Sequence, residues 1–256
     1  RIYGPINFST FGSYRIRLNT FEEGAFPSEP YNAPYYAGLL EELGYTCGQK
    51  YMSQLMSMEA AVQKVAGKRE ALKIAPEAEG FSVDLMDGAK FLQALPEMYA
   101  MVDDIFGQNL GYTPIPYELF EIACGQPYAK RMCPLTSVMI RSPEGELAAI
   151  FLTFPDYGPL VAQGHADPIP LSEVSFEKDF SRLEKKALLM KTGGVSPQFR
   201  RLGLHNMMAL RMLEEGRDQY DVGVAALIRD GNPSARFYGD ICEVVREYGL
   251  FVKDLA

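Results

Sequence analysis

The stretch from Ala187 to Tyr238 constrains the fold of this chain more than any other. An apolar run at 187–192 predicts a strand, and the apolar residues that recur over 204–213 predict a helix buried on a wide face. A second apolar run at 222–228 is typical of a central strand covered on both faces. The order strand, turn, helix, strand therefore predicts an α/β fold.

The turn before this helix is a candidate anion site. Gly203 lies where the chain leaves the strand and starts the helix. The first N–H groups of a helix lack partners within the helix and carry the positive end of its dipole, so backbone donors can hold a phosphate there. The predicted anchor is the backbone of Arg201, Leu202, Gly203, Leu204, His205 and Asn206, assisted by the charge of Arg200.

Two glycines, Gly193 and Gly194, stand near the end of the first strand. Glycine inside a strand indicates a bulge or a close approach of another group to the backbone. A bulge frees N–H and C=O groups of the ladder, and these groups can then pair with an extended ligand that contains amides.

The run from Arg200 to His205 resembles the Gln/Arg-x-x-Gly-x-Gly/Ala signature of the GNAT N-acyltransferase superfamily. The arginine and the central glycine fit, whereas His205 stands where the family usually has a small residue. Asn232, Ala235 and Tyr238 are similar to the Asn-x-x-Ala and the tyrosine that the superfamily often carries on the next helix. The resemblance implies the GNAT fold, which is a mixed, mostly antiparallel central sheet flanked by helices.

The resemblance covers roughly 81–256 and implies transfer of an acyl group, acetyl first of all, from acyl-coenzyme A to a primary amine. Gly194 and Val195 would hold the pantetheine arm of coenzyme A, and a backbone N–H near Val195 would stabilise the oxyanion. Tyr238 is the candidate general acid for the departing thiolate, and Asp156 is one candidate general base, with a chain of waters as the other. The co-substrate is then acetyl-coenzyme A or another acyl-coenzyme A, and no metal is expected.

Three of these residues keep a structural alternative. Asn232 fits a helix N-cap as well as a ligand to the arm, because Asn-Pro-Ser is typical of a helix start. Tyr238 fits a core tyrosine as well as an acid. His205 is interpreted as a phosphate neighbour or a packing residue rather than as a base.

Two other functions remain open. A GNAT-like scaffold that has lost catalysis is consistent with His205, whose side chain would crowd a pyrophosphate. An acyltransferase that uses acyl carrier protein or a long-chain donor would depend less on the adenine end. The acceptor is open among a small amine, an amino acid and a peptide or protein amine, and the acidic net charge weakly favours a cationic one.

Composition excludes several classes of protein. With 256 residues, 47% of them hydrophobic, the chain has material for one large or two small globular domains. A net charge of −8 argues against a general nucleic-acid binder, and no apolar run is long enough to span a bilayer. Four scattered cysteines and two histidines give no zinc pattern, so we expect reduced thiols in a cytoplasmic protein. A homodimer is compatible with this interpretation.

The N-terminal part has a resemblance of its own. Bacterial tandem GNAT-like proteins, in which one GNAT-like half precedes a second, are similar in three runs: Gly4-Pro5-Ile6-Asn7-Phe8-Ser9, Pro30-Tyr31-Asn32 and Leu43-Gly44-Tyr45. Residues 1–78 are therefore predicted to form a partial or degenerate GNAT-like module, and 79–256 the acyltransferase domain, with the boundary at 76–80. The start at Arg1 is typical of a fragment.

Two roles are open for this N-terminal part. It either packs against the second module or forms a wall on the substrate side, with Tyr35 or Tyr36 facing a cleft.

Periodicity and turn residues predict the remaining elements. Helices are expected at 39–43, 52–72, 89–106 with a break at Pro96, and 117–124. Strands are expected at 14–18, 81–85, 136–141, 147–154 and 244–252. The segment 158–186 is expected to be a long loop and a candidate lid.

Overall fold

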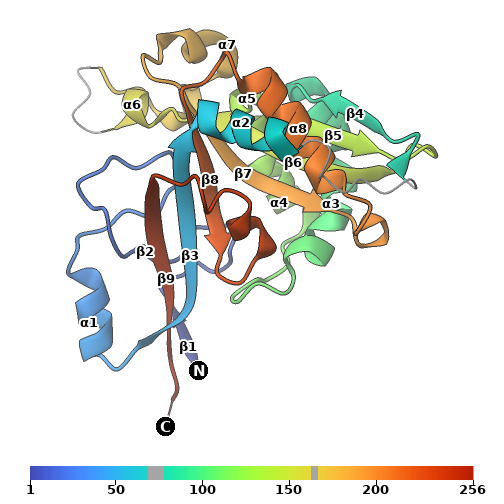
Figure 1. Cartoon of the computed structure of the whole chain (residues 1–256). Coiled ribbons are helices and arrows are strands. Elements are labelled where there is room, and N and C mark those ends of the chain that lie inside the picture. The colour runs from blue at the N-terminus through green and yellow to red at the C-terminus, as the bar shows by residue number, and fades with distance from the viewer. Residues whose placement is uncertain (69–77, 163–166, 256) are drawn as a thin grey trace.

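The computed structural model describes residues 1–68, 78–162 and 167–255. Within these residues the centre is a nine-stranded sheet in the order β1-β9-β3-β8-β7-β6-β5-β4, with the short β2 also paired to β9 (Figure 1). The strands are β1 Ile2–Gly4, β2 Ile16–Arg17, β3 Thr46–Ser57, β4 Ser82–Leu85, β5 Val138–Arg141, β6 Leu147–Pro155, β7 Ala187–Val195, β8 Val222–Arg229 and β9 Val244–Lys253. These strands pair antiparallel, except that β7 and β8 are parallel. The predicted mixed, mostly antiparallel sheet is confirmed.

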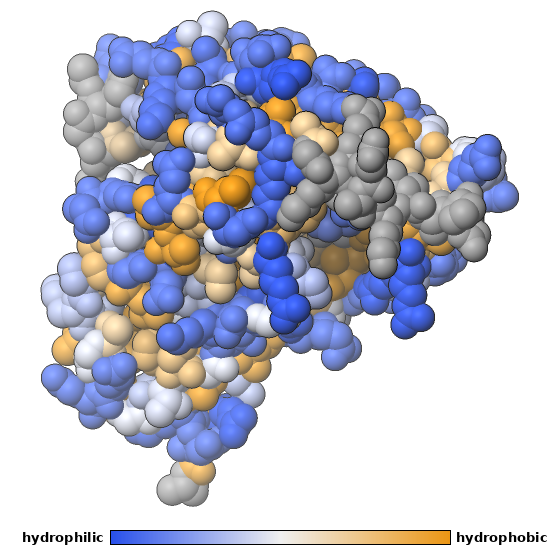
Figure 2. Space-filling view, in the orientation of Figure 1, coloured by the Kyte–Doolittle hydropathy of each residue, from blue (hydrophilic) through white to orange (hydrophobic). Residues whose placement is uncertain are grey.

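Helices cover both faces of this sheet (Figure 1). The helices are α1 Tyr36–Glu42, α2 Met58–Lys68, α3 Gly88–Phe106, α4 Tyr117–Cys124, α5 Gln126–Arg131, α6 Gly158–Val161, α7 Phe176–Asp179 and α8 Leu204–Gly216. On one face, α2 and α8 pack together over a core that includes Met58, Met208 and Met212. On the other face, α3, α4 and α5 enclose a core that includes Phe91 and Met98. The surface in the same view is mostly hydrophilic, with apolar residues gathered near its middle (Figure 2).

The helix predicted over 52–72 is wrong in its first part, because Thr46–Ser57 form β3. This strand lies between β9 and β8 and pairs along both of its edges, so its backbone groups are satisfied without a helix. Methionine and glutamine favour helices locally, but pairing to two neighbours overrides that preference. The helix starts at Met58, where the Ser57 hydroxyl accepts the Ala60 N–H at 3.2 Å. The predicted end of the helix lies outside the described residues.

The N-terminal strands are part of the same sheet as the rest of the chain. β1, β2 and β3 all pair with β9, and β3 also pairs with β8. A buried ion pair fastens the loop before α1 to β9, with Arg246 Nη1 2.9 Å from Glu29 and Arg246 Nη2 2.8 Å from Glu23. The boundary predicted at 76–80 lies mostly outside the described residues, and the division into two modules stays a prediction.

Helix α3 runs through Gly88–Phe106 without interruption, so the break predicted at Pro96 is wrong. The helix begins with Asp87, whose side chain accepts the Lys90 N–H at 2.8 Å. Proline removes one N–H donor and crowds the preceding turn. The buried apolar side of α3 packs on β6 around this position and holds the helix together.

The described part of the segment 158–186 contains more secondary structure than the long loop that was predicted. It contains α6, α7 and turns of 3₁₀ helix at Leu171–Glu173 and Phe180–Arg182. It has a small core of its own, formed by Tyr157, Leu160, Val174 and Leu183. The Phe180 ring lies 5.5 Å from the Tyr220 ring, just beyond α8. A role as a lid stays a prediction, and His165 lies outside the described residues.

Candidate active site

Two neighbouring strands separate in the middle of the sheet. β7 and β8 pair in parallel only over Ala187–Met190 and Val222–Ala225. Just beyond, β7 has an extra residue at Lys191 relative to β6, and β8 has one beside Leu227, whose φ is 58°, relative to β3. Bulges bend the strands that carry them. β7 therefore stays alongside β6, and β8 stays alongside β3. A gap opens between the two parallel strands as a result.

The bulge in β7 lies just before the glycine pair that predicted it. Gly193 and Gly194 stay paired with Phe151 and Ile150 of β6. A Cβ atom on Gly194 would lie 2.4 Å from Ile105 Cδ1 of α3, so this position has no room for a side chain. Close approach of a neighbouring element, the other meaning of glycine in a strand, explains the pair.

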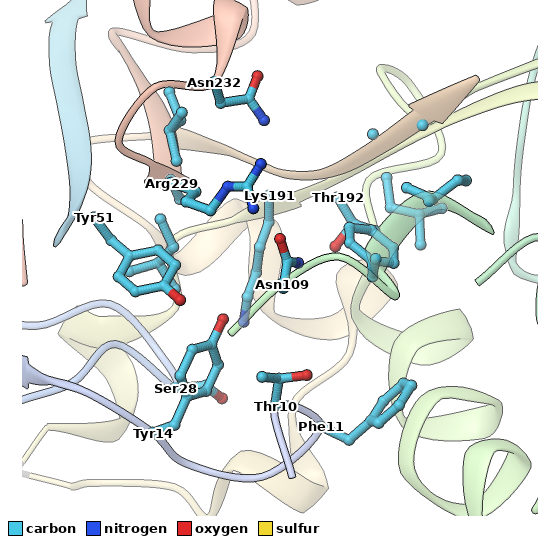
Figure 3. Close-up of a pocket in the computed structure, with 18 of the residues that line it drawn as sticks. Thr10, Phe11, Tyr14, Ser28, Tyr51, Asn109, Lys191, Thr192, Arg229 and Asn232 are labelled. Atoms are coloured by element: carbon cyan, nitrogen blue, oxygen red, sulfur yellow. The ribbon is translucent and has the colours of Figure 1, made fainter. Parts of the chain in front are cut away.

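A cavity of about 1680 Å³ occupies the gap and reaches both faces of the sheet. Its walls come from the ends of β7 and β8, the start of α8, helix α3 and the N-terminal segments 10–16 and 28–32. Figure 3 shows Lys191, Arg229 and Tyr14 pointing into this space from β7, β8 and the N-terminal part.

The N-terminal part therefore forms one wall of the cavity. Tyr36 lines the cavity, whereas Tyr35 is 62% exposed and is absent from its lining. No described residue of the segment 158–186 lines it.

Helix α8 begins at the edge of this cavity. Gly203 precedes it with φ at 80°, in the left-handed region that glycine favours. No side chain caps this end, and the N–H groups of Asn206 and Met207 both return to the Gly203 carbonyl, at 2.9 and 3.2 Å. The N–H groups before them have no acceptor within the helix and lie at the positive end of its dipole. The predicted anion site has the backbone geometry that it requires.

Only one of the two neighbouring arginines faces the cavity. Arg200 lines it and donates to the Asp104 carbonyl at 3.2 Å, whereas Arg201 is exposed and does not line it. Leu202 and Leu204 turn away into the core beneath α8. They hold the turn in place, and their side chains do not face the cavity.

His205 stands on the cavity wall between two aromatic rings. Its ring centroid lies 6.3 Å from that of Phe151 and 5.8 Å from that of Phe237. The residue keeps an exposed surface, yet the surrounding walls desolvate the imidazole and lower its pKa. The side chain is therefore a neutral ring in the wall at neutral pH, which matches a packing residue.

Asn232 and Tyr238 lie on the far side of the gap, after β8. The Asn232 side chain accepts the Ser234 N–H at 3.0 Å and caps a turn of 3₁₀ helix at Pro233–Arg236. Asn232 lines the cavity as well. Tyr238 is 6% exposed, lies in the core beside α8 and also lines the cavity. Burial raises the pKa of its phenol, so the hydroxyl keeps its proton.

Asp156 lies away from these residues. It follows β6 at the end where β7 begins, and its backbone N–H donates to the Ala187 carbonyl at 2.8 Å. Its carboxylate accepts the Gly158 N–H at 2.8 Å and so starts α6. Burial raises the pKa of Asp156, but the residue does not line the cavity. The structure places its carboxylate in the turn before α6 and does not bring it to the other candidate residues.

Three cations in the cavity, Arg15, Lys191 and Arg229, were missed by the sequence analysis. Arg15 is 8% exposed, and its guanidinium carbon lies 3.8 Å from the Tyr14 ring centroid and 4.2 Å from that of Tyr51. Lys191 occupies the bulge of β7. Burial, with the charges of Arg131 and Arg15, lowers the pKa of Lys191 to about 8. Lys191 could have been found in the sequence as a lone lysine inside an apolar strand. No sequence feature pointed to Arg15.

Other classes of site find no support in the described residues. They contain no group of three or more His, Cys, Asp or Glu side chains placed to hold a metal ion. No helix among them has the length and apolar character needed to cross a bilayer. All four cysteines are free thiols.

No protein-family model matches the chain, and no curated protein does. The fold is similar to that of several solved structures. A GCN5-related N-acetyltransferase from Sphaerobacter thermophilus is 13% identical with a TM-score of 0.49, over 86% of this chain and 56% of that chain. A tandem GNAT protein from the clavulanic acid biosynthesis pathway is 12% identical with a TM-score of 0.49, over 93% of this chain and 62% of that chain.

A third solved structure is the Saccharomyces cerevisiae N-myristoyltransferase with bound myristoyl-CoA. It is 10% identical with a TM-score of 0.42, over 79% of this chain and 48% of that chain. The chain thus spans less than two thirds of the length of all three structures. They include members of the superfamily that the Gly203 turn resembles, and the activity proposed below rests on residues of this chain.

Proposed function

We propose that this protein is an N-acyltransferase that moves an acyl group from acyl-coenzyme A to a primary amine. The observation that carries the proposal is the gap between β7 and β8, which opens beside the uncapped N-terminus of α8. A pyrophosphate fits the backbone donors after Gly203 with Arg200 beside them. An extended arm fits the gap, because the side of β7 that faces β8 has no strand partner beyond Met190.

The chemistry divides between backbone and side chains. The amine nitrogen attacks the thioester carbonyl, a C–N bond forms, and the C–S bond breaks to release the coenzyme A thiolate. A backbone N–H of β7 near Val195 stabilises the oxyanion. The Tyr238 phenol, which carries its proton at neutral pH, donates a proton to the thiolate.

The attacking amine must lose a proton. Asp156 lies outside the described lining of the cavity, so a chain of waters is the candidate route for that proton.

A donor with a long acyl chain is a second candidate. The cavity reaches apolar side chains on α3 and α4, among them Phe91, Met98, Val102 and Phe120. An acetyl group leaves most of this apolar surface uncovered, whereas a longer chain covers it and gains free energy of burial. The donor is then a longer acyl-coenzyme A or an acyl carrier protein.

Binding of acyl-coenzyme A by calorimetry tests both candidates. We expect acetyl-coenzyme A to bind the wild type, and Arg200→Ala with Gly203→Glu to lose that binding. Arg217→Met is the matched control, because Arg217 is an exposed arginine at the opposite end of α8. Tighter binding of hexanoyl- or palmitoyl-coenzyme A indicates the long-chain donor. The proposal fails if no acyl-coenzyme A binds, or if the turn variants bind as well as the wild type.

A further inference from the structure

We propose that Arg15 and Lys191 form a subsite for a carboxylate, so that the amine acylated by this protein carries a carboxylate, as a free amino acid does. The class of acceptor rests on the acyl transfer proposed above. The carboxylate site itself does not rest on acyl transfer, because a binding measurement detects the site directly.

Arg15 is a buried cation with two nitrogen atoms that have no hydrogen-bond partner. It is 8% exposed, and its Nε and Nη1 atoms are buried without a hydrogen-bond partner. The rings of Tyr14 and Tyr51 lie against the guanidinium, with centroids 3.8 and 4.2 Å from its central carbon. Aromatic rings satisfy the faces of a guanidinium, but its N–H groups point outward in its own plane and need oxygen acceptors. A buried guanidinium in this state is stabilised when an anion binds to it.

The groups around Arg15 lack a partner too. The Tyr51 hydroxyl is buried without a hydrogen-bond partner, and its residue is 3% exposed. Lys191 extends from β7 into the same cavity, toward the N-terminal part that carries Tyr14 (Figure 3). No described residue forms an ion pair or a hydrogen bond with the Lys191 ammonium group. Its pKa is lowered by burial first and then by the charges of Arg131 and Arg15, so these cations lie near one another.

The charge of the cavity is opposite to the charge of the chain. Its described lining holds four cations, Arg15, Lys191, Arg200 and Arg229, and one acidic residue, Glu29. Glu29 is already neutralised, because its carboxylate binds Arg246 at 2.9 Å and accepts hydrogen bonds from Tyr248 and the Phe26 N–H. A protein with a net charge of −8 therefore has a positive cavity, which favours an anionic ligand.

The position of this cluster separates it from the donor site. Lys191 is surrounded by Tyr128 and Arg131 of α5, on the sheet face opposite α8. The anion site after Gly203 belongs to the α8 face, and the gap between β7 and β8 connects the two. Acyl donor and acceptor thus enter from opposite faces. A guanidinium fork with a neighbouring ammonium group suits the two oxygens of a planar carboxylate.

Product analogues test the subsite without requiring turnover. We would titrate the wild type with twenty N-acetyl-L-amino acids and with the matching carboxamides, by calorimetry at pH 7. We expect one or more acids to bind at least tenfold more tightly than their carboxamides. Arg15→Met should weaken binding of those acids about 10- to 100-fold and leave their carboxamides unchanged. Arg15→Lys should restore part of the loss, and Tyr51→Phe should cost a few-fold.

Control titrations distinguish this proposal from the proposed function. Acetyl-coenzyme A should bind Arg15→Met as it binds the wild type, and Arg217→Met should bind all probes normally. If acids and carboxamides bind alike, if no acid binds, or if Arg15→Met binds the acids normally, the carboxylate site is wrong. Loss of acetyl-coenzyme A binding in Arg15→Met would show that Arg15 binds the donor, which also contradicts the carboxylate site. Failure of the wild type to bind any acyl-coenzyme A counts against the proposed function alone. Unchanged near-ultraviolet circular dichroism shows that a variant is folded. If Arg15→Met is not folded, the titrations are made with Tyr51→Phe instead.

Discussion

The two ends of the cavity differ in how the chain builds them. The proposed donor end is made by consecutive residues around Gly203 and offers mainly backbone N–H groups. The proposed acceptor end brings Arg15, Tyr51 and Lys191 together from three distant parts of the chain and offers side chains. A backbone site is set by local conformation, so a short motif can reveal it. A side-chain site assembled by sheet pairing leaves no such motif.

The largest effect should come from removing the cation that fastens the acceptor end to the sheet. Arg246 is 8% exposed and binds the buried carboxylate of Glu29 as well as Glu23. Arg246→Met leaves a buried carboxylate without a counter-charge, which should lower the free energy of unfolding by about 3–5 kcal/mol. Urea denaturation measures this change. Adding Glu29→Gln should recover much of the loss, and an equally unstable double variant would show that the ion pair is not the cause.

The same variants test whether the two ends of the cavity are independent of each other. In the folded fraction of Arg246→Met we expect weaker binding of N-acetyl amino acids and unchanged binding of acyl-coenzyme A. Equal losses of both would mean that the N-terminal part also supports the donor end.

Next in size is the effect of a negative charge in the turn of the donor end. Gly203→Glu places a carboxylate among the backbone donors and forces a side chain into the left-handed region, at φ of 80°. We expect acyl-coenzyme A affinity to fall at least about 100-fold, or roughly 3 kcal/mol. Gly203→Ala is the control, because it carries the backbone strain without the charge. If both substitutions weaken binding equally, conformation rather than charge decides anion binding there.

This contrast also explains what could be predicted from the sequence. The strand, the turn and the helix from Ala187 onward were placed correctly, because apolar runs and one glycine define them locally. Residues 52–57 of β3 were predicted as the start of a helix, because only pairing with β8 and β9 makes this segment a strand. Asp156 was chosen by its place after a strand, but its carboxylate accepts the Gly158 N–H in the turn before α6 and does not line the cavity. Arg15 carried no signal, because its importance comes from burial between Tyr14 and Tyr51.

A smaller effect is expected from the titration of Lys191. Its pKa is lowered to about 8 in the folded protein and is near 10.4 in an unfolded chain. Between these values the unfolded state binds more protons, so the stability of the wild type relative to Lys191→Met should rise from about pH 8 to about pH 10. The expected gain is of the order of 2–3 kcal/mol, after allowance for the part of the side chain that lines the open cavity.

Denaturation at several pH values measures this difference. Lys178→Met serves as the control, because it removes a lysine that is exposed. A carboxylate probe that binds Lys191 should raise its pKa, which nuclear magnetic resonance of a ¹³C-methylated amine detects. If the stability difference between the wild type and Lys191→Met does not change with pH, or if the probe leaves the pKa of Lys191 unchanged, Lys191 is not part of the acceptor end.

The smallest expected effect distinguishes two roles of Asn232, a residue of the cavity wall after β8. Its side chain caps the turn after β8 by accepting the Ser234 N–H at 3.0 Å, and the same residue lines the cavity. Asn232→Ala should cost about 1 kcal/mol of stability, because the cap is lost. Asn232→Asp keeps an acceptor for the cap but has no amide N–H to offer a ligand. If both variants bind acyl-coenzyme A more weakly while only Asn232→Ala is less stable, the amide also binds the donor arm. If Asn232→Asp restores both stability and binding, Asn232 acts through the backbone that it caps, as Gly203 does on the other side of the gap.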